Sequence, residues 1–106
     1  MSKLSVETTS TNWGSCIKLL EKEQIEGNVE IGIFTCELGK ALERHGHDDA
    51  AEWCYILSGE ADFDCDGEIT HAKQGDLIYL PAHSNHTSYP TGDIAFSSVY
   101  IVCKDS

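Results

Sequence analysis

The sequence has few positive charges, and it lacks any long apolar run. Its 106 residues include 7 Lys and Arg against 18 Asp and Glu, so the formal net charge is -11. Such a surface repels phosphate groups, which argues against binding to nucleic acid or to an anionic membrane. No segment has the pattern of a signal peptide or a membrane span, so we expect a cytoplasmic protein with neither partner.

Closely spaced cysteines are also missing. The chain has five cysteines but no Cys-x-x-Cys pair of the kind that a zinc knuckle requires. Their odd number and wide spacing, in a chain expected to be cytoplasmic, predict reduced thiols that serve mostly as small core residues. The five are Cys16, Cys36, Cys54, Cys65 and Cys103.

The composition fits one small globular domain. Hydrophobic residues make up 41% of the chain, and there are nine glycines but only two prolines. Residues 1–12 are polar and rich in Ser and Thr. We therefore expect a loose N-terminal arm over residues 1–12 and a single domain over residues 13–106.

Short β-strand patterns separated by turns fill most of that domain. Residues 60–66 alternate apolar and acidic side chains, which indicates a strand with one solvated face, and Asp66-Gly67 supplies a two-residue hairpin turn. Residues 15–24 are the only segment that could form a helix. The whole pattern therefore predicts an all-β sandwich or closed barrel. The expected strands are residues 29–36, 52–58, 60–66, 77–80 and 95–102.

Two histidines one residue apart, followed by a glutamate, are the clearest chemical signal. Side chains two residues apart on a strand face the same side, so His45 and His47 can both point at one metal ion. Glu52 opens the next expected strand after a four-residue bend, from which its carboxylate can return to the same place. Imidazole and carboxylate ligands suit Fe, Mn, Ni, Co or Zn. The alternative interpretation is an exposed polar loop.

The spacing around these residues resembles the two sequence motifs of the cupin superfamily. The second motif usually has glycine where His83 stands and asparagine where Pro90 stands, and neither departure removes a ligand. The resemblance implies that His86 completes a metal centre formed by His45, His47 and Glu52. The matching patterns are Gly39-x5-His45-x-His47-x4-Glu52-x6-Gly59 and Gly75-x5-Pro81-x-His83-x2-His86.

The resemblance also implies a fold and an assembly. Cupins are small antiparallel jelly-roll barrels, also called double-stranded β-helices, and they are often dimeric. The barrel mouth would be the pocket for a small-molecule substrate or ligand. Trp53, Tyr55 and Leu57 alternate with Glu52, so they would point away from the pocket and could form a homodimer contact.

Three kinds of function remain open for such a protein. The first is a metal-dependent enzyme, either a dioxygenase, the leading class by resemblance, or an isomerase or lyase acting on a sugar acid or similar compound. The second reaction class needs a proton shuttle, for which His83 and Tyr79 are candidates, although His83 is more simply a surface residue or a hydrogen-bond donor to a ligand. The other kinds are a non-catalytic module that binds or senses a small ligand or metal, and a purely structural zinc site.

Overall fold

The computed structural model describes residues 6–20, 29–46 and 49–104, and these residues form ten β-strands and no helix. One sheet comprises β1 (Glu7–Ser10), β2 (Gly14–Leu20), β3 (Val29–Cys36), β5 (Ala50–Ser58), β8 (Leu77–Leu80) and β10 (Phe96–Lys104). The other comprises β4 (His45–Gly46), β6 (Glu60–Cys65), β7 (Glu68–Lys73) and β9 (Asn85–Pro90).

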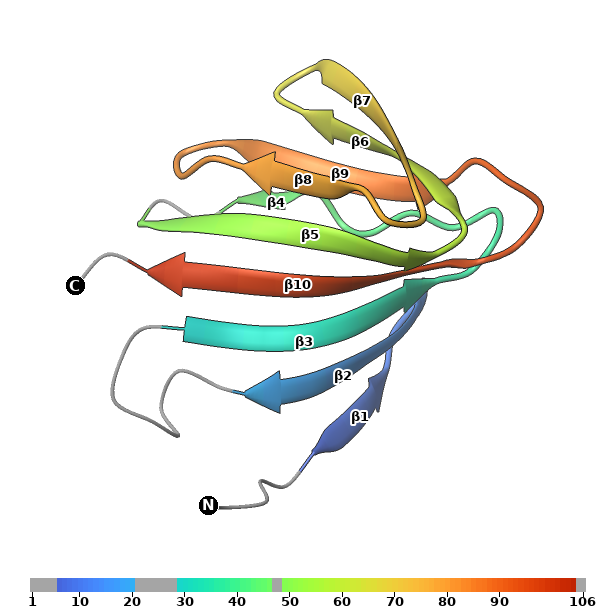
Figure 1. Cartoon of the computed structure of the whole chain (residues 1–106), viewed down its shortest axis with the longest axis horizontal. Coiled ribbons are helices and arrows are strands. Elements are labelled where there is room, and N and C mark those ends of the chain that lie inside the picture. The colour runs from blue at the N-terminus through green and yellow to red at the C-terminus, as the bar shows by residue number, and fades with distance from the viewer. Residues whose placement is uncertain (1–5, 21–28, 47–48, 105–106) are drawn as a thin grey trace.

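All pairings in both sheets are antiparallel. The larger sheet has the strand order β1-β2-β3-β10-β5-β8, and the smaller sheet has the order β4-β9-β6-β7. Figure 1 shows β6, β7 and β9 above the strands β5, β10 and β3 of the larger sheet. The predicted all-β, two-layered fold is therefore confirmed, and among the described residues no helix could span a membrane.

The strands predicted from alternation and β-branched content are confirmed. β3 and β8 have the predicted bounds, and β5, β6 and β10 lie within two residues of theirs. The hairpin turn between β6 and β7 is confirmed as well. Asp66 and Gly67 have φ values of 51° and 91°, and two successive positive φ angles define the type I′ turn that suits the twist of paired strands.

The N-terminal part of the chain forms two strands that the sequence analysis did not assign. Residues 14–20 form β2 rather than a helix, and residues 21–24 lie outside the described residues. The pairing of β2 with β3 decides the outcome, because its hydrogen bonds outweigh a weak local helix preference. Part of the segment expected to be a loose arm, Glu7–Ser10, pairs with β2 as the exposed edge strand β1.

One core lies between the two sheets. Phe34 and Phe96 of the larger sheet meet edge to face with ring centroids 5.4 Å apart, and Phe63 of the smaller sheet lies 6.1 Å from Phe96. Cys54 and Ile56 of β5 are fully buried in the same cluster, as the parity of β5 predicted. All five cysteines are free thiols, and Cys36 and Cys54 are buried.

The outer face of the larger sheet is apolar, because the residues that alternate with the core residues are apolar too. Tyr55 and Leu57 are exposed and Trp53 is half-buried, so these side chains point away from the core as predicted. Cross-strand pairing places Trp53 and Tyr55 in two rows of apolar side chains that run across the sheet. The rows are Ile17, Ile33, Val99, Tyr55 and Leu77, and Ile31, Ile101, Trp53 and Tyr79.

Candidate metal centre

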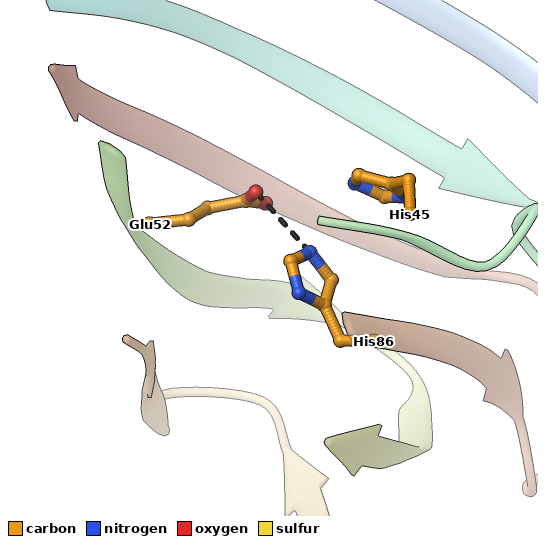
Figure 2. A group of neighbouring side chains, drawn as sticks. All are labelled: His45, Glu52 and His86. Atoms are coloured by element: carbon orange, nitrogen blue, oxygen red, sulfur yellow. Dashed lines mark ion pairs between the residues drawn. The ribbon is translucent and has the colours of Figure 1, made fainter. Parts of the chain in front are cut away.

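Three of the four residues that the cupin motifs single out meet between the sheets. His45, on β4, and His86, on β9, are direct cross-strand partners in the smaller sheet, and Glu52 projects toward them from β5 of the larger sheet. One ligand atom from each residue lies within 4.8 Å of the others (Figure 2). His47 lies outside the described residues.

Two members of this group are buried, which is costly for groups that can carry charge. Glu52 is 7% exposed and His86 is 4% exposed, and the His86 Nε2 atom lies 3.5 Å from the Glu52 Oε1 atom. The Cys54 thiol donates a hydrogen bond of 3.4 Å to the other carboxylate oxygen. Burial, followed by the nearby Glu52 carboxylate, raises the pKa of the Cys54 thiol well above its usual range, so the thiol remains a donor.

A backbone contact sets the orientation of the His45 ring. The Nδ1 atom of His45 lies 2.8 Å from the Glu43 carbonyl oxygen, and because a carbonyl only accepts, Nδ1 carries the proton. Nε2 is then the ring nitrogen that would bind a metal. Metal-binding histidines are commonly oriented in this way by a carbonyl that accepts from the second ring nitrogen. Two imidazoles and a carboxylate at these distances fit a divalent transition metal.

Gly46 allows β4 to approach β9 closely. A Cβ atom on Gly46 would lie 2.1 Å from the Ser84 carbonyl oxygen, a separation that no side chain tolerates. The glycine between the two histidines is therefore required by a close backbone contact, which the sequence pattern alone did not reveal. Any larger residue would push β4, and His45 with it, away from His86.

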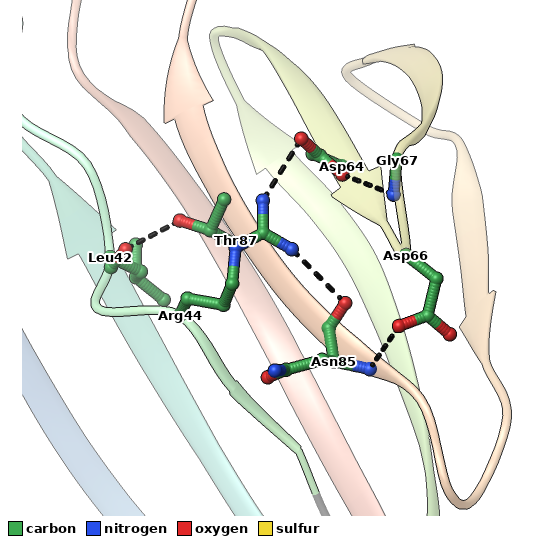
Figure 3. A network of polar contacts seen from close by, with 7 residues as sticks. All are labelled: Leu42, Arg44, Asp64, Asp66, Gly67, Asn85 and Thr87. Carbon is green, nitrogen blue, oxygen red and sulfur yellow. Dashed lines mark hydrogen bonds and ion pairs between the residues drawn. The ribbon is translucent and has the colours of Figure 1, made fainter.

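Polar contacts fasten the segment before β4 onto the smaller sheet (Figure 3). The Arg44 guanidinium forms an ion pair of 2.9 Å with Asp64 on β6 and donates a hydrogen bond of 3.3 Å to the Asn85 carbonyl oxygen. The Thr87 hydroxyl donates a hydrogen bond to the carbonyl oxygen of Leu42, which lies in the segment before β4. These contacts compensate for the shortness of β4, which has only two residues.

The β6–β7 turn reinforces the same region from the other side. The backbone N–H of Asn85 donates to the Asp66 carboxylate, and the backbone N–H of Asp66 donates to the Asn85 carbonyl oxygen, each at 2.9 Å. Asp64 also accepts from the N–H of Gly67 at 2.9 Å. The start of β9, one residue before His86, is thus fixed by the turn that the sequence predicted.

A cavity of about 190 Å³ lies beside the three metal-binding candidates. His45 and Glu52 line one part of it, and most of the remaining wall is apolar. The cavity is therefore small and mostly apolar with polar groups on one side, which are common properties of ligand sites. Its apolar wall consists of Trp13, Phe34, Leu42 and Val102.

A second polar group lines the cavity, and sequence reasoning did not single it out. The Tyr100 hydroxyl donates a hydrogen bond of 3.2 Å to the Glu30 carboxylate and lies 3.6 Å from the Cys16 Sγ atom. Burial, with the contacts to Cys16 and Glu30, raises the pKa of Tyr100 well above its usual range, so the phenol stays protonated. The inward position of Tyr100 in the alternation of β10 was the signal that the sequence offered.

The structure does not bring the two catalytic candidates from the sequence to this cavity. His83 is exposed and has a positive φ of 65°, in the turn before β9. Tyr79 is 56% exposed, and its ring lies 5.4 Å from the Trp53 ring on the outer face of the larger sheet. Among the described tyrosines, Tyr100 is the one that lines the cavity.

Known structures share this fold. A predicted oxalate decarboxylase from Thermotoga maritima aligns with 97% of this chain and 95% of its own, at a TM-score of 0.78 and 22% identity. The cupin domain of Cnp3 from Schizosaccharomyces pombe aligns with 96% of this chain and 69% of its own, at a TM-score of 0.81 and 13% identity. A candidate sugar phosphate isomerase from Acidithiobacillus ferrooxidans aligns with 70% of this chain and 49% of its own, at a TM-score of 0.63 and 25% identity.

These likenesses show that the chain has the fold of known cupin structures. A family model described as the AraC-like ligand binding domain matches residues 28–105, so the chain belongs to this cupin-type family. A comparison with curated proteins finds no match.

Replacing Gly46 tests the close backbone contact. Gly46→Ala should separate β4 from β9, destabilise the protein, and weaken the binding of Co²⁺ by about tenfold or more, as losses of supporting contacts around metal sites do. Gly92→Ala is the matched control, because a Cβ there meets only the Glu60 side chain, at 3.4 Å or more. Thermal unfolding and a Co²⁺ absorption titration measure the two effects. An unchanged Co²⁺ affinity in Gly46→Ala contradicts the assigned role.

Proposed function

We propose that this protein is a metal-dependent cupin enzyme that acts on a small, oxygen-chelating metabolite. Its divalent metal would be held by His45, Glu52 and His86, together with His47, which the sequence motif supplies. The observation that carries the proposal is the group of three ligand atoms within 4.8 Å of one another, two of whose residues, His45 and Glu52, line a cavity. A group beside a cavity favours an open, reactive metal over a closed structural zinc site.

The residues around the cavity have defined roles in this proposal. The apolar wall excludes water and holds a small substrate by contact, while Glu43 fixes the His45 ring and Cys54 fixes one Glu52 oxygen. A divalent metal bound there supplies Lewis-acid activation of a chelating oxygen group and, as Fe(II), reactivity with dioxygen. Tyr100 is the protonated group that faces the substrate from another part of the wall.

Dioxygenase is the leading reaction class, by resemblance to metal-binding cupins. Isomerase or lyase chemistry on a sugar acid is the alternative, and the likeness to the candidate sugar phosphate isomerase supports it. That alternative needs a proton shuttle. Tyr100 meets the requirement better than His83 or Tyr79, because neither of these lines the cavity.

A non-catalytic function is the second candidate, and one observation favours it. The family model that matches the chain is described as a ligand binding domain. In this alternative the cavity and the metal centre bind or sense a small molecule without turnover. The fold is common to both functions, so only the chemistry of the bound ligand separates them.

We also propose that two copies form a homodimer through the outer face of the larger sheet. Two apolar rows cross this face, and Tyr55, Leu77 and Tyr79 are 45%, 60% and 56% exposed. A contiguous apolar face of this kind is typical of a protein contact, and a two-fold dimer covers it on both copies at once. The five free thiols support a reducing, cytoplasmic location.

Loss of a metal-binding side chain tests the centre. Removing a residue that only supports a metal ligand typically lowers metal affinity by about 10–100-fold. His45→Ala and Glu52→Ala should each lower it further, because each removes a ligand atom. His83→Ala should retain the wild-type content, expected near one metal per chain. Mass spectrometry of protein purified without an affinity tag gives the metal content. Full occupancy in Glu52→Ala, or loss in His83→Ala, contradicts the assignment.

Turnover separates the enzyme from the binding module. Iron-loaded protein should consume oxygen with a small diol or thiol, whereas Zn-, Mn- or Ni-loaded protein is screened for isomerisation or cleavage of sugar acids. Activity should be lost in Glu52→Ala and should persist in Glu68→Gln, which alters an exposed carboxylate on β7. Tight binding of a ligand without product would favour the non-catalytic function.

A charge on the apolar face tests the dimer. Tyr55→Asp places two like charges across a two-fold contact and should weaken dimerisation by about tenfold or more. Ile69→Asp is the control, because Ile69 is 57% exposed on β7 of the other sheet. Light scattering after size-exclusion chromatography measures the mass. A monomeric wild-type protein would rule out the proposed assembly.

A further inference from the structure

The cavity has a second polar end around Glu30, a residue to which the proposed metal chemistry gives no role. Glu30 on β3 and Glu52 on β5 are both cross-strand partners of Val102 on β10, and all three side chains line the cavity. Two strand spacings separate the glutamates, so their backbones lie about 10 Å apart along one row. The cavity therefore has a carboxylate at each end of this row.

Hydrogen bonding at the Glu30 end leaves acceptor atoms facing the cavity. The single proton of the Tyr100 hydroxyl is donated to the Glu30 carboxylate at 3.2 Å. In the contact with Cys16, at 3.6 Å, the thiol is then the donor and the phenol oxygen accepts. The oxygen atoms of Glu30 and Tyr100 therefore favour a ligand group that donates hydrogen bonds.

The strand beneath Tyr100 is shaped to seat this side chain. A Cβ on Gly32 would lie 2.4 Å from the Tyr100 ring, so only glycine lets the ring lie directly against β3. Glycine in the middle of a strand is unfavourable, which makes a packing reason the natural explanation. Gly32 and Tyr100 thus position the phenol beside Glu30.

Aromatic side chains elsewhere in the cavity wall are also compatible with a cation. Trp13 and Phe34 line the same cavity with their rings in edge-to-face contact, at a centroid distance of 6.2 Å. Aromatic rings attract ammonium groups, and a carboxylate such as that of Glu30 binds them by charge-assisted hydrogen bonds. A second carboxylate on the ligand would instead be repelled by Glu30.

We propose that the cavity selects a small amino acid-like ligand, whose protonated amine contacts Glu30 and Tyr100 while its oxygen group lies toward His45 and Glu52. The oxygen end of this inference rests on the proposed metal centre, whereas the amine end rests on Glu30 and Tyr100 alone. The apolar wall between the two ends accommodates a short carbon chain. Dicarboxylates of the same length are disfavoured.

Calorimetric titration with four matched ligands tests the amine end. The ligands 3-aminopropanoate, 3-hydroxypropanoate, butanoate and succinate share a carboxylate on a two-methylene chain and differ only in the far group. Metal-loaded wild-type protein at pH 7 should bind 3-aminopropanoate about tenfold or more tightly than butanoate, because a charge-assisted hydrogen bond is formed. Succinate should bind most weakly.

Variants of Glu30 and Tyr100 test whether these two residues cause the preference for 3-aminopropanoate. Glu30→Gln keeps an acceptor for Tyr100 but removes the charge, and it should lower the affinity for 3-aminopropanoate about tenfold while leaving butanoate nearly unchanged. Tyr100→Phe should lower the same affinity by about threefold, which gives a second measurement should Glu30→Gln fold poorly. Glu68→Gln changes the net charge equally at an exposed site on β7 and should behave as wild type.

The outcomes separate this inference from the proposed function. Equal or tighter binding of succinate or butanoate by the wild-type protein overturns the inference, as does absence of 3-aminopropanoate binding or an amine preference that survives in Glu30→Gln. Metal content is measured on the same samples. Wild-type protein without metal contradicts the metal centre instead, and the same four titrations on it still decide the amine preference.

Discussion

The close pairing of β4 with β9 is the constraint on which the site depends. His45 and His86 can share one metal only because the two strands run side by side, and Gly46 makes that approach possible. A two-residue strand contributes little stability of its own. The contacts of Arg44 and Thr87 with the smaller sheet therefore carry much of the task of holding His45 in place.

The site also joins the two sheets. Glu52 comes from the larger sheet and His86 from the smaller one, and both are buried where an apolar pair would pack more favourably. Burying a carboxylate beside an imidazole carries a desolvation cost that the contact between them only partly offsets. Polar groups retained at such a cost usually serve function, and a bound cation would compensate the buried negative charge.

The sequence was sufficient to predict five of the ten strands in the described residues and to single out the candidate site residues, because both depend on local spacing. The alternation of apolar and acidic residues located β6. The dipeptide Asp66-Gly67 after it predicted a turn with two positive φ angles. Strand parity placed Glu52 inward, and the cupin resemblance added His86. The segment that became β2 was ambiguous because its local composition suits a helix, and only pairing with β3 decides it.

The second end of the cavity could not be predicted, because it depends on register between distant segments. Cys16, Glu30 and Tyr100 lie on three different strands, and no motif spacing connects them. Their meeting requires the pairing of β10 with β3 and of β3 with β2 to be known residue by residue. Conversely, His83 and Tyr79 were considered because of their residue type, and neither reaches the cavity.

The two faces of β5 link the proposed site to the proposed dimer. Glu52 and Cys54 face the interior, while Trp53 and Tyr55 face outward into the apolar rows. A slip of one residue would exchange the two sets, exposing the carboxylate and burying the indole. Contacts that cover the outer face therefore penalise every slipped register. Dimerisation would thus help to keep Glu52 aligned with His86, in addition to covering apolar surface.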